Sequence, residues 1–376
     1  MHIPDFSISR LPRIEFGNGS RRKLPGLLAR YGKRLLVVTG GKRFRDSLHW
    51  QELSEELLRQ GFSWENFAVN GEPSPQLVDQ AVQDLRNTGI EVVLAIGGGS
   101  VLDAAKAIAG LLKPGNSVMD HLEGVGPEHP YRGPSTPFIA VPTTAGTGSE
   151  ATKNAVLSVQ GDGGYKKSFR DEQLVPEYAV LDPELLESCP PALIAANGMD
   201  ALTQLLESFV STRANPFTDA LALSGITAVR DGFFDWVENG PDAAAGREKM
   251  AYAALLSGIT LAQAGLGSVH GLAAPLGAFF PIPHGVACGT LLATATQINI
   301  DLMEAREPDN PALKKYAQLG RLFRGRTHVE EVGARVFLVH TLKEWSRRLN
   351  LPRLGEFGIG AADVDRVVAH CRGSSM

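Results

Sequence analysis

The sequence has few cysteines and no excess of positive charge. Its 376 residues include three cysteines that are far apart in the chain, Cys189, Cys288 and Cys371. An odd number without a CxxC pair does not indicate a disulfide framework, so we give none of the three a role. The 37 Lys and Arg are balanced by 41 Asp and Glu. Because no basic excess is available to neutralise phosphates, we expect neither nucleic acid nor a membrane surface as a partner.

Two further absences bear on membranes. The first residues, MHIPDFSISRLPRIEFG, lack a basic segment that leads into an apolar stretch, so we expect no signal peptide and a cytoplasmic protein. From Met250 to Ile300, 51 consecutive residues contain no Asp, Glu, Lys or Arg. Polar residues and prolines, among them Gln263, His270 and Pro281, interrupt this run, which excludes a clean membrane span. We expect it to be a buried region instead.

The pattern of apolar residues predicts two structural classes in succession. In the first half, short apolar runs alternate with amphipathic helical patterns, with strands expected at 34–40, 67–69, 91–96 and 138–144 and helices at 47–61 and 75–87. Such alternation favours a parallel sheet covered by helices, with ligands at the carboxyl ends of the strands. After a small hairpin or loop at 155–168, helical periodicity dominates. We predict an α/β domain over residues 1–185 and an all-helical domain over residues 186–376.

A first glycine loop, residues 97–100, follows the expected strand at 91–96. Gly97, Gly98 and Gly99 precede Ser100, which forms a capping-box pattern with Asp103. Glycines let a ligand approach the backbone, and the start of a helix offers free N–H groups and a partial positive charge, which suit a pyrophosphate. A glycine triplet alone also fits a tight turn, because it lacks the G-x-G-x-x-G spacing.

A second glycine loop, residues 142–154 (PTTAGTGSEATKN), follows the expected strand at 138–144 and is rich in hydroxyl and amide groups. It could be an ordinary polar surface loop. Two such loops at the ends of neighbouring strands are better explained by one extended ligand, such as a dinucleotide, that lies across both.

Candidate metal ligands occur in the second half. Asp200 and Gln204 are four residues apart and share one face of a helix, with Glu207 near them as a possible acceptor for a ligand's hydrogen bond. His270 and His284 lie within the charge-free run. A carboxylate, an amide oxygen and two imidazoles can hold a divalent transition metal and leave a position open for substrate. Each residue alone also has an ordinary structural explanation.

Four segments, GGGSVLDAAKA, VPTTAGTGSE, GMDALTQLLESFVS and GSVHGLAAPLGAFFPIPHGVA, strongly resemble the iron-containing (group III) alcohol dehydrogenase family, which belongs with the dehydroquinate synthase-like proteins. The likeness covers nearly the whole chain. It implies an N-terminal α/β domain with a parallel sheet that binds NAD(P), and an all-helical C-terminal domain that binds the metal. It further implies a cleft for a small alcohol, aldehyde or ketone, and a homodimer.

The resemblance also implies roles for individual residues. Those expected at the cofactor diphosphate are Gly98, Gly99, Ser100 and Asp103. Those expected to line the nucleotide site are Thr143, Thr144, Thr147 and Asn154. Lys166, or Lys167 if the alignment has a gap, would match the family's active-site lysine, and Asp200, His270 and His284 would be metal ligands.

Two departures from the family affect the chemistry. Gln204 stands where the family usually has a histidine, and because an amide oxygen is neutral, we expect weaker binding of the metal, either Fe²⁺ or Zn²⁺. Ala274 stands where many members carry a second histidine proposed to pass a proton to solvent. We therefore assign no catalytic acid or base.

A third departure concerns the cofactor. Gly40 stands where NAD-preferring members often have an aspartate that would repel a 2′-phosphate. The cations Lys42, Arg43 and Arg45 follow it, so we favour NADP over NAD. The same cations would also suit a solvated helix start, which leaves NAD open.

The motifs and the resemblance together predict a metal-dependent, NAD(P)-linked alcohol dehydrogenase or aldehyde or ketone reductase. Hydride would pass between the nicotinamide and a metal-bound small alcohol or carbonyl. One alternative is a cyclase similar to dehydroquinate synthase, in which bound NAD is reduced and reoxidised within a cycle. Another is a nucleotide-binding homologue without catalysis, because Gln204 and Ala274 both replace expected histidines.

Overall fold

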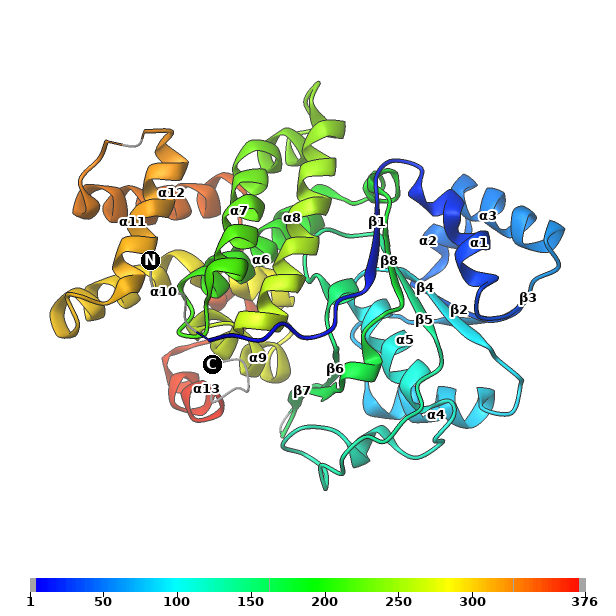
Figure 1. Cartoon of the computed structure of the whole chain (residues 1–376). Coiled ribbons are helices and arrows are strands. Elements are labelled where there is room, and N and C mark those ends of the chain that lie inside the picture. The colour runs from blue at the N-terminus through cyan, green and yellow to red at the C-terminus, as the bar shows by residue number, and fades with distance from the viewer. Residues whose placement is uncertain (1–4, 162, 327, 372–376) are drawn as a thin grey trace. The chain divides into compact units, whose positions relative to one another are not determined.

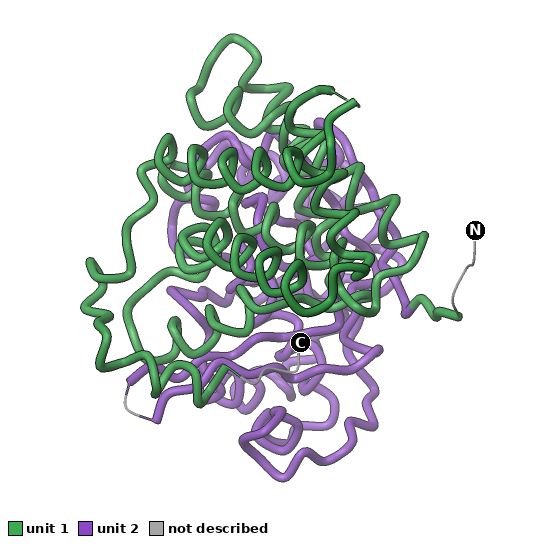
Figure 2. Tube along the Cα trace, turned by 90° about the vertical axis from the view of Figure 1, so that its left-hand side faces the viewer, with its two compact units in different colours: residues 1–8, 190–376 green, residues 9–189 purple. Residues whose placement is uncertain are grey.

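The computed structural model describes residues 5–161, 163–326 and 328–371, which fall into two compact units (Figure 2). One unit is Ser9–Cys189. The other is Pro190–Met376, to which the N-terminal segment Met1–Ile8 is assigned. The two consecutive prolines at 190 and 191 stand where the second unit begins. The domain boundary that we expected after residue 185 stays a prediction.

The Ser9–Cys189 unit is built on a six-stranded parallel sheet with the order β1-β8-β5-β4-β2-β3 (Figure 1). Its strands are β1 (Arg13–Phe16), β2 (Arg34–Thr39), β3 (Ser63–Ala68), β4 (Val92–Gly97), β5 (Phe138–Pro142) and β8 (Tyr178–Leu181). All strand pairs are parallel, which confirms the predicted α/β fold class. The hairpin of β6 (Asn154–Val159) and β7 (Tyr165–Arg170) forms a separate antiparallel sheet.

The sheet order places a switch point between β2 and β4. From β2 the chain goes to β3 on one side and then returns to β4 on the other side of β2. In doubly wound sheets, ligands bind beyond the carboxyl ends of the strands at such a point. Gly40 follows β2 there, and Gly97 at the end of β4 is in register with Pro142 at the end of β5. The two glycine loops therefore leave neighbouring strands at the same edge.

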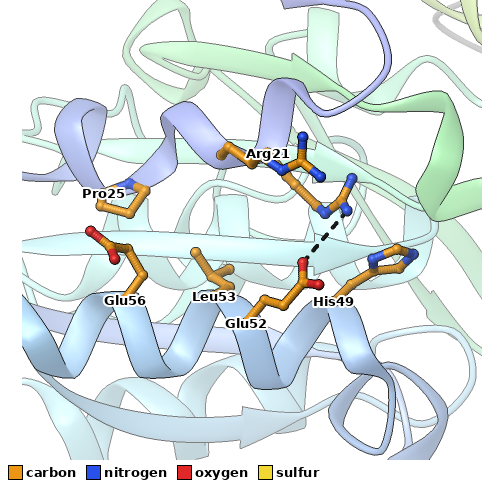
Figure 3. Close-up of a pocket in the computed structure, with 7 residues that line it drawn as sticks. Arg21, Pro25, His49, Glu52, Leu53 and Glu56 are labelled. Carbon is orange, nitrogen blue, oxygen red and sulfur yellow. Dashed lines mark ion pairs between the residues drawn. The ribbon is translucent and has the colours of Figure 1, made fainter.

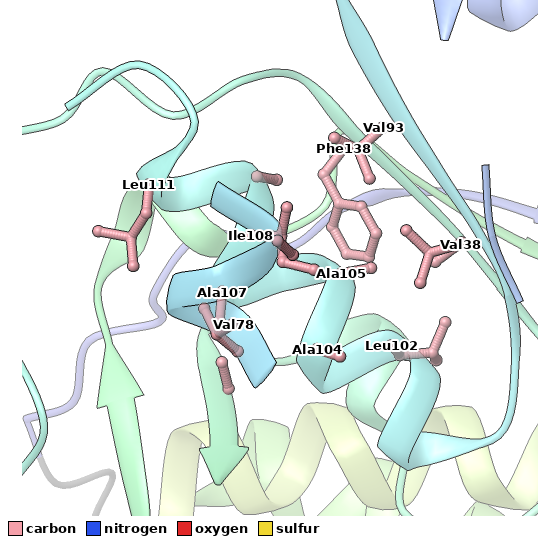
Figure 4. Packing of buried hydrophobic residues seen from close by; sticks show 14 of the residues in the cluster. Val38, Val78, Val93, Leu102, Ala104, Ala105, Ala107, Ile108, Leu111 and Phe138 are labelled. Carbon is pink, nitrogen blue, oxygen red and sulfur yellow. The ribbon is translucent and has the colours of Figure 1, made fainter. Parts of the chain in front are cut away.

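Helices α3 (Leu48–Arg59), α4 (Pro75–Leu85) and α5 (Gly99–Leu111) cover the sheet, with the short α1 (Leu24–Leu28) and α2 (Lys42–Arg45). Ser47 and Ser74 cap α3 and α4, because each hydroxyl accepts a hydrogen bond from a backbone N–H in the first turn. α5 is buried on nearly all sides. In Figure 4, Ile108 and Ala105 of α5 lie with Val38, Val93 and Phe138 of the sheet, and the alanines of α5 allow this close approach.

The Pro190–Met376 unit is helical. Its helices are α6 (Pro191–Val210), α7 (Pro216–Val237), α8 (Ala243–Ala264), α9 (Ser268–Phe279), α10 (His284–Arg306), α11 (Pro311–Arg324), α12 (Glu331–Arg348) and α13 (Val364–His370) (Figure 1). Prolines begin α6, α7 and α11, at the position where the missing N–H costs no helical bond. No strand occurs between residues 190 and 371 among those described. The predicted helical second half is confirmed.

The charge-free run Met250–Ile300 spans most of α8, all of α9 and most of α10, and a majority of its residues are buried. Among the residues described, no single helix has the length and apolar composition needed to cross a membrane. One pair of helices, α8 with α9, meets that test only when taken together, and it is bent by 102°.

Candidate metal centre and nucleotide loops

Four side chains from three helices of the Pro190–Met376 unit converge on one point. They are Asp200 of α6, His270 of α9, and His284 and Cys288 of α10, and one donor atom of each lies within 4.8 Å of the others. Asp200 Oδ1 is 3.3 Å from His270 Nε2 and 3.8 Å from His284 Nε2. Asp200, His270 and Cys288 are buried, whereas His284 is partly exposed. The structure thus brings three of the predicted metal ligands together, and it adds a cysteine.

Close packing of α10 on α6 produces this convergence. His284 is the first residue of α10, and Cys288 follows one turn later on the same face. Gly285 lies between these two residues, and a Cβ atom there would lie 2.5 Å from the carbonyl oxygen of Ala196. Gly289 follows Cys288, and a Cβ atom there would lie 2.8 Å from Met199 Cβ. These glycines let α10 approach the backbone of α6, so that His284 and Cys288 reach Asp200.

Glu207 fixes the orientation of His270. It lies on α6 with Asp200, and its carboxylate accepts hydrogen bonds from His270 Nδ1 at 2.7 Å and from the backbone N–H of Val269 at 2.7 Å. The first bond commits Nδ1, so Nε2 faces the cluster as an acceptor for a cation. The second bond satisfies a free N–H at the start of α9, where a negative charge is favourable. Glu207 is therefore the acceptor that the sequence suggested.

Gln204 lies one turn after Asp200 on α6 and is buried. Its Oε1 accepts a hydrogen bond from Ser257 Oγ of α8 at 2.7 Å. The same hydroxyl lies 2.8 Å from the carbonyl oxygen of Ala254. The amide oxygen that we considered as a metal ligand is thus held by a neighbouring helix, and its role as a ligand stays a prediction.

The cluster is strongly coupled electrostatically. Burial raises the pKa of Asp200, but His284 and His270 lower it by more, so its pKa lies below the usual value. Burial lowers the pKa of His270, and Cys288, Asp200 and Glu207 raise it well above the usual value. Burial raises the pKa of Cys288 to about 11. A carboxylate, two imidazoles and a thiol are donors that a divalent transition metal accepts, and its binding would displace the protons.

The first glycine loop differs from the sequence expectation at one point. α5 begins at Gly99, and Gly98 is the residue before it, in an extended conformation. The first helical hydrogen bonds run from Val101 N and Leu102 N to Gly98 O. Ser100 therefore lies inside the first turn, and the predicted capping box of Ser100 and Asp103 is wrong. The N–H groups that precede Val101 at the start of α5 have no acceptor within the helix, which suits an anion.

The glycines of this loop also have a packing role. A Cβ atom at Gly98 would lie 3.3 Å from Thr144 Oγ1, and one at Gly99 would lie 2.7 Å from Thr147 Oγ1. The second glycine loop consequently rests against the start of α5. Thr143 joins the two loops, because its N–H donates to the carbonyl oxygen of Gly97 at 3.0 Å.

Lys106 of α5 is a structural residue that sequence reasoning missed. Its buried Nζ donates to the carbonyl oxygens of Ser149 at 2.8 Å and Asn154 at 2.7 Å, and to Thr152 Oγ1 at 3.0 Å. Asp103 accepts from Ser149 Oγ at 2.5 Å. Together they hold the second glycine loop on α5. The available signal was the spacing of Asp103 and Lys106, which are one turn apart. Burial lowers the pKa of Lys106 to about 8.

The remaining predicted cofactor residues lie in two places. Gly40 follows β2 and precedes α2. Two of the cations there have protein partners, since Arg45 Nε donates to Thr39 Oγ1 at 2.9 Å and an Arg43 amino group donates to Ser188 O at 3.3 Å. The side-chain ammonium of Lys42 has no hydrogen bond or ion pair with the part of the chain that the structure describes, whereas its carbonyl oxygen accepts from Asp46 N. Lys166, on β7, forms an ion pair with Glu72 at 2.6 Å.

A separate pocket of about 310 Å³ lies in the Ser9–Cys189 unit (Figure 3). None of the motifs described above contributes to it. The guanidinium of Arg21 is engaged by Asp182 at 2.7 Å, by Glu184 at 2.5 Å and by Glu52 at 3.8 Å. Carboxylates therefore already neutralise the Arg21 guanidinium, and we assign the pocket no role. Its lining residues are Arg21, Arg22, Pro25, His49, Glu52, Leu53 and Glu56.

Comparison with protein families gives two matches that together cover most of the chain. Residues 12–183 match the model described as iron-containing alcohol dehydrogenase. Residues 194–373 match the model described as Fe-containing alcohol dehydrogenase family, C-terminal.

Individual relatives and solved structures agree with these matches. Alcohol dehydrogenase 4 of Schizosaccharomyces pombe is 41% identical over 301 residues, which cover 79% of this chain and 68% of the relative. NADPH-dependent butanol dehydrogenase of Clostridium saccharobutylicum is 31% identical over 362 residues, covering 93% and 86%. The structure of a 1,3-propanediol oxidoreductase superposes with a TM-score of 0.87 at 27% identity, covering 99% and 94%. The structure of sulfoacetaldehyde reductase from Bifidobacterium kashiwanohense, in complex with NAD⁺, superposes with a TM-score of 0.81 at 26% identity. The match covers 99% of this chain and 94% of that structure.

Proposed function

Because the chain belongs to the iron-containing alcohol dehydrogenase family, we propose that Asp200, His270 and His284 hold the divalent metal of its catalytic site. The family makes the protein a metal-dependent alcohol dehydrogenase or aldehyde reductase, an NAD(P)-linked oxidoreductase that acts on CH–OH groups. This assignment selects the dehydrogenase over the cyclase that the sequence left open.

The observation that carries the metal proposal is the convergence of three buried or partly buried donors from α6, α9 and α10. When bound, the metal supplies a Lewis acid for the substrate oxygen, and the nicotinamide donates or accepts the hydride. Asp200 offers a negative charge that offsets part of the cation's charge. Glu207 keeps His270 in the tautomer whose Nε2 can bind. The uncharged run Met250–Ile300 supplies both histidines and introduces no competing charge.

The proposed nucleotide site lies in the Ser9–Cys189 unit. The start of α5, with Gly98, Gly99, Ser100 and Asp103, would hold the diphosphate, because its free N–H groups and helix dipole attract anions. Thr143, Thr144, Thr147 and Asn154 would line the site, and Lys166 stays the candidate active-site lysine. The sheet's switch point supports this assignment.

We favour NADP over NAD. Gly40 has no carboxylate that would repel the 2′-phosphate of NADP at the expected ribose position. The Lys42 ammonium forms no ion pair with the described part of the chain. One of the relatives is named NADPH-dependent butanol dehydrogenase, and one solved structure contains NAD⁺, so both nucleotides occur among similar proteins. The relatives' names also favour small alcohols, diols and aldehydes as substrates.

Two broader expectations remain proposals. We propose a homodimer, on the resemblance to the family. We propose a cytoplasmic protein, since all three cysteines are free thiols, which is usual in a reducing compartment.

The direct test is removal of one ligand. His284→Ala should lose bound metal and turnover, with both measured on purified protein by metal analysis and by oxidation of short alcohols and diols with NAD and NADP in parallel. His340→Ala, at an exposed position of α12, is the matched control and should keep both. Metal content that is unchanged in His284→Ala would contradict the ligand assignment.

A further inference from the structure

We propose that Cys288 is a fourth protein ligand of the metal and that its sulfur shifts the site's selectivity from iron towards zinc. This inference rests on the proposed metal site. The family resemblance supplied only Asp200, His270 and His284, with Gln204 in place of the missing histidine. The structure places a cysteine thiol where the cluster needs one more donor.

The distances fit one ion bound by four donors. Cys288 Sγ lies 3.7 Å from His270 Nε2 and 3.7 Å from His284 Nε2. Asp200 Oδ1 lies 3.3 Å and 3.8 Å from the same two nitrogens. Donors bound tetrahedrally at zinc–nitrogen, zinc–oxygen and zinc–sulfur bond lengths are separated by roughly 3.3–3.6 Å. The cluster needs only small side-chain adjustments to reach this arrangement.

Local structure fixes the thiol at this point. Cys288 is one turn after His284 on α10, so both side chains leave the same face of the helix. Gly289, the next residue, packs against Met199 on α6, which keeps this turn beside Asp200. Gln204 is instead engaged by Ser257. The cysteine is therefore better placed than the glutamine to complete the donor set.

The chemistry of sulfur determines the metal preference. Thiolate is a soft ligand that suits zinc better than Fe²⁺, whereas an all-nitrogen-and-oxygen set discriminates less. Zinc also accepts a fifth ligand, so four protein donors leave room for a substrate. Since most sites already bind zinc more tightly than Fe²⁺, the informative quantity is the change in the ratio of the two affinities when the sulfur is removed.

The first experiment uses cobalt as a spectroscopic probe. Purified protein is stripped with a chelator and loaded with Co²⁺, and the near-ultraviolet spectrum is recorded for sulfur-to-cobalt charge transfer. The wild type and the control Cys371→Ser should both show this band, and Cys288→Ser should lose it. Bound cobalt without the band in the wild type would overturn the sulfur ligand and leave the metal site intact. Failure of the wild type to bind any metal would overturn the metal site as well.

The second experiment measures affinity. In chelator competition, Cys288→Ser should bind Zn²⁺ at least roughly 10- to 100-fold more weakly than the wild type. Loss of a residue that only supports a ligand already weakens metal binding by this factor, and loss of a ligand should weaken it no less. The loss for Fe²⁺, measured without oxygen, should be smaller, so the Zn²⁺/Fe²⁺ affinity ratio falls. The double variant Gln204→His with Cys288→Ser restores a family-type nitrogen donor and should regain affinity without the cobalt–sulfur band, which separates ligand loss from misfolding. An unchanged ratio in Cys288→Ser would contradict the proposal.

Discussion

Glu207 performs two tasks that can be separated experimentally. Its carboxylate orients His270 and also accepts the N–H of Val269 at the start of α9. A glutamine can still accept the backbone hydrogen bond, but it carries no charge to polarise the imidazole. We expect Glu207→Gln to weaken metal binding by roughly 10- to 100-fold, with a much smaller effect on folding.

Chelator competition and thermal unfolding of the metal-free protein measure the two effects. The exposed Glu248→Gln on α8 serves as the control and should change neither. A Glu207→Gln variant that unfolds far more easily while it retains full metal affinity would show that the residue is only a helix cap.

Glu150 in the second glycine loop makes stability depend on pH. It is buried beside Lys106 and Asp103, and burial raises its pKa from 4.5 to about 7. The unfolded chain ionises near the ordinary value. Between about pH 4.5 and 7 the folded state therefore holds the extra proton, and stability falls as the pH rises. The full effect is of the order of 3 kcal/mol, because one pKa unit corresponds to about 1.4 kcal/mol.

Glu150→Gln removes this titration. In urea unfolding, the variant should gain stability relative to the wild type as the pH rises from about 5 to about 8. Glu55→Gln, at an exposed position of α3, is the control for the loss of one negative charge. A difference between Glu150→Gln and wild type that stays constant with pH would refute the explanation.

Single residues also show where sequence reasoning stops. Asp200, His270 and His284 were selected by motif, and the structure brings them together. Cys288 was given no role, although it is one turn from His284, because a lone cysteine in an apolar run is usually a small core residue. Lys106 was missed because a lysine in a helix is usually solvated. Asp103, one turn away, was the only local signal, because neither the burial of Lys106 nor its hydrogen-bond acceptors, which are more than 40 residues away, can be read from local pattern.

At the scale of elements, the approach of α10 to α6 decides whether the metal ligands meet. A Cβ atom at Gly285 would lie 2.5 Å from the backbone oxygen of Ala196, so Gly285→Ala must push the start of α10 outward. Overpacking of this kind costs roughly 1–3 kcal/mol. Because His284 is the preceding residue, the same displacement should reduce metal affinity.

The prediction is checked by thermal unfolding and metal titration of Gly285→Ala. Gly333→Ala on α12 is the matched control, since its Cβ would meet only Val329 at 3.7 Å. That control should leave metal binding intact and stabilise the helix by about 0.5–1 kcal/mol. Normal metal affinity in Gly285→Ala would mean that α10 need not pack so closely.

Element predictions succeeded where the pattern was long and failed where it was short. The buried strands β2, β4 and β5 and the helices α3 and α4 were all found, because apolar runs and amphipathic patterns mark them locally. β1 and β8 were missed. Each has four residues, too few for a periodic signal, and they pair with each other across more than 160 residues of sequence. Their strand character therefore depends on a tertiary contact that no local window contains.

At the scale of the whole molecule, the two proposed ligand sites belong to different compact units. The glycine loops lie in Ser9–Cys189, and Asp200, His270, His284 and Cys288 lie in Pro190–Met376. The change from alternating strands and helices to helices alone was readable in the sequence, because periodicity changes from mixed to purely helical. The contacts between the loop residues could not be read from the sequence, because the packing of glycines against threonines in the first unit is a tertiary contact.

Because the two sites lie in different units, we predict that binding of the metal can be abolished without loss of nucleotide binding, and the reverse. A ligand that binds only the folded state at about 100 times its Kd adds about 2.7 kcal/mol of stability, which raises the unfolding temperature. His284→Ala should lose the increase caused by Zn²⁺ and keep the increase caused by NADP. Gly99→Ala, whose Cβ would lie 2.7 Å from Thr147 Oγ1, should lose the NADP effect and keep the Zn²⁺ effect. Both variants should lose turnover, because hydride transfer needs nucleotide and metal together. If His284→Ala lost both thermal responses, the metal ligands would be supporting the nucleotide loops as well, and the independence of the two sites would be wrong.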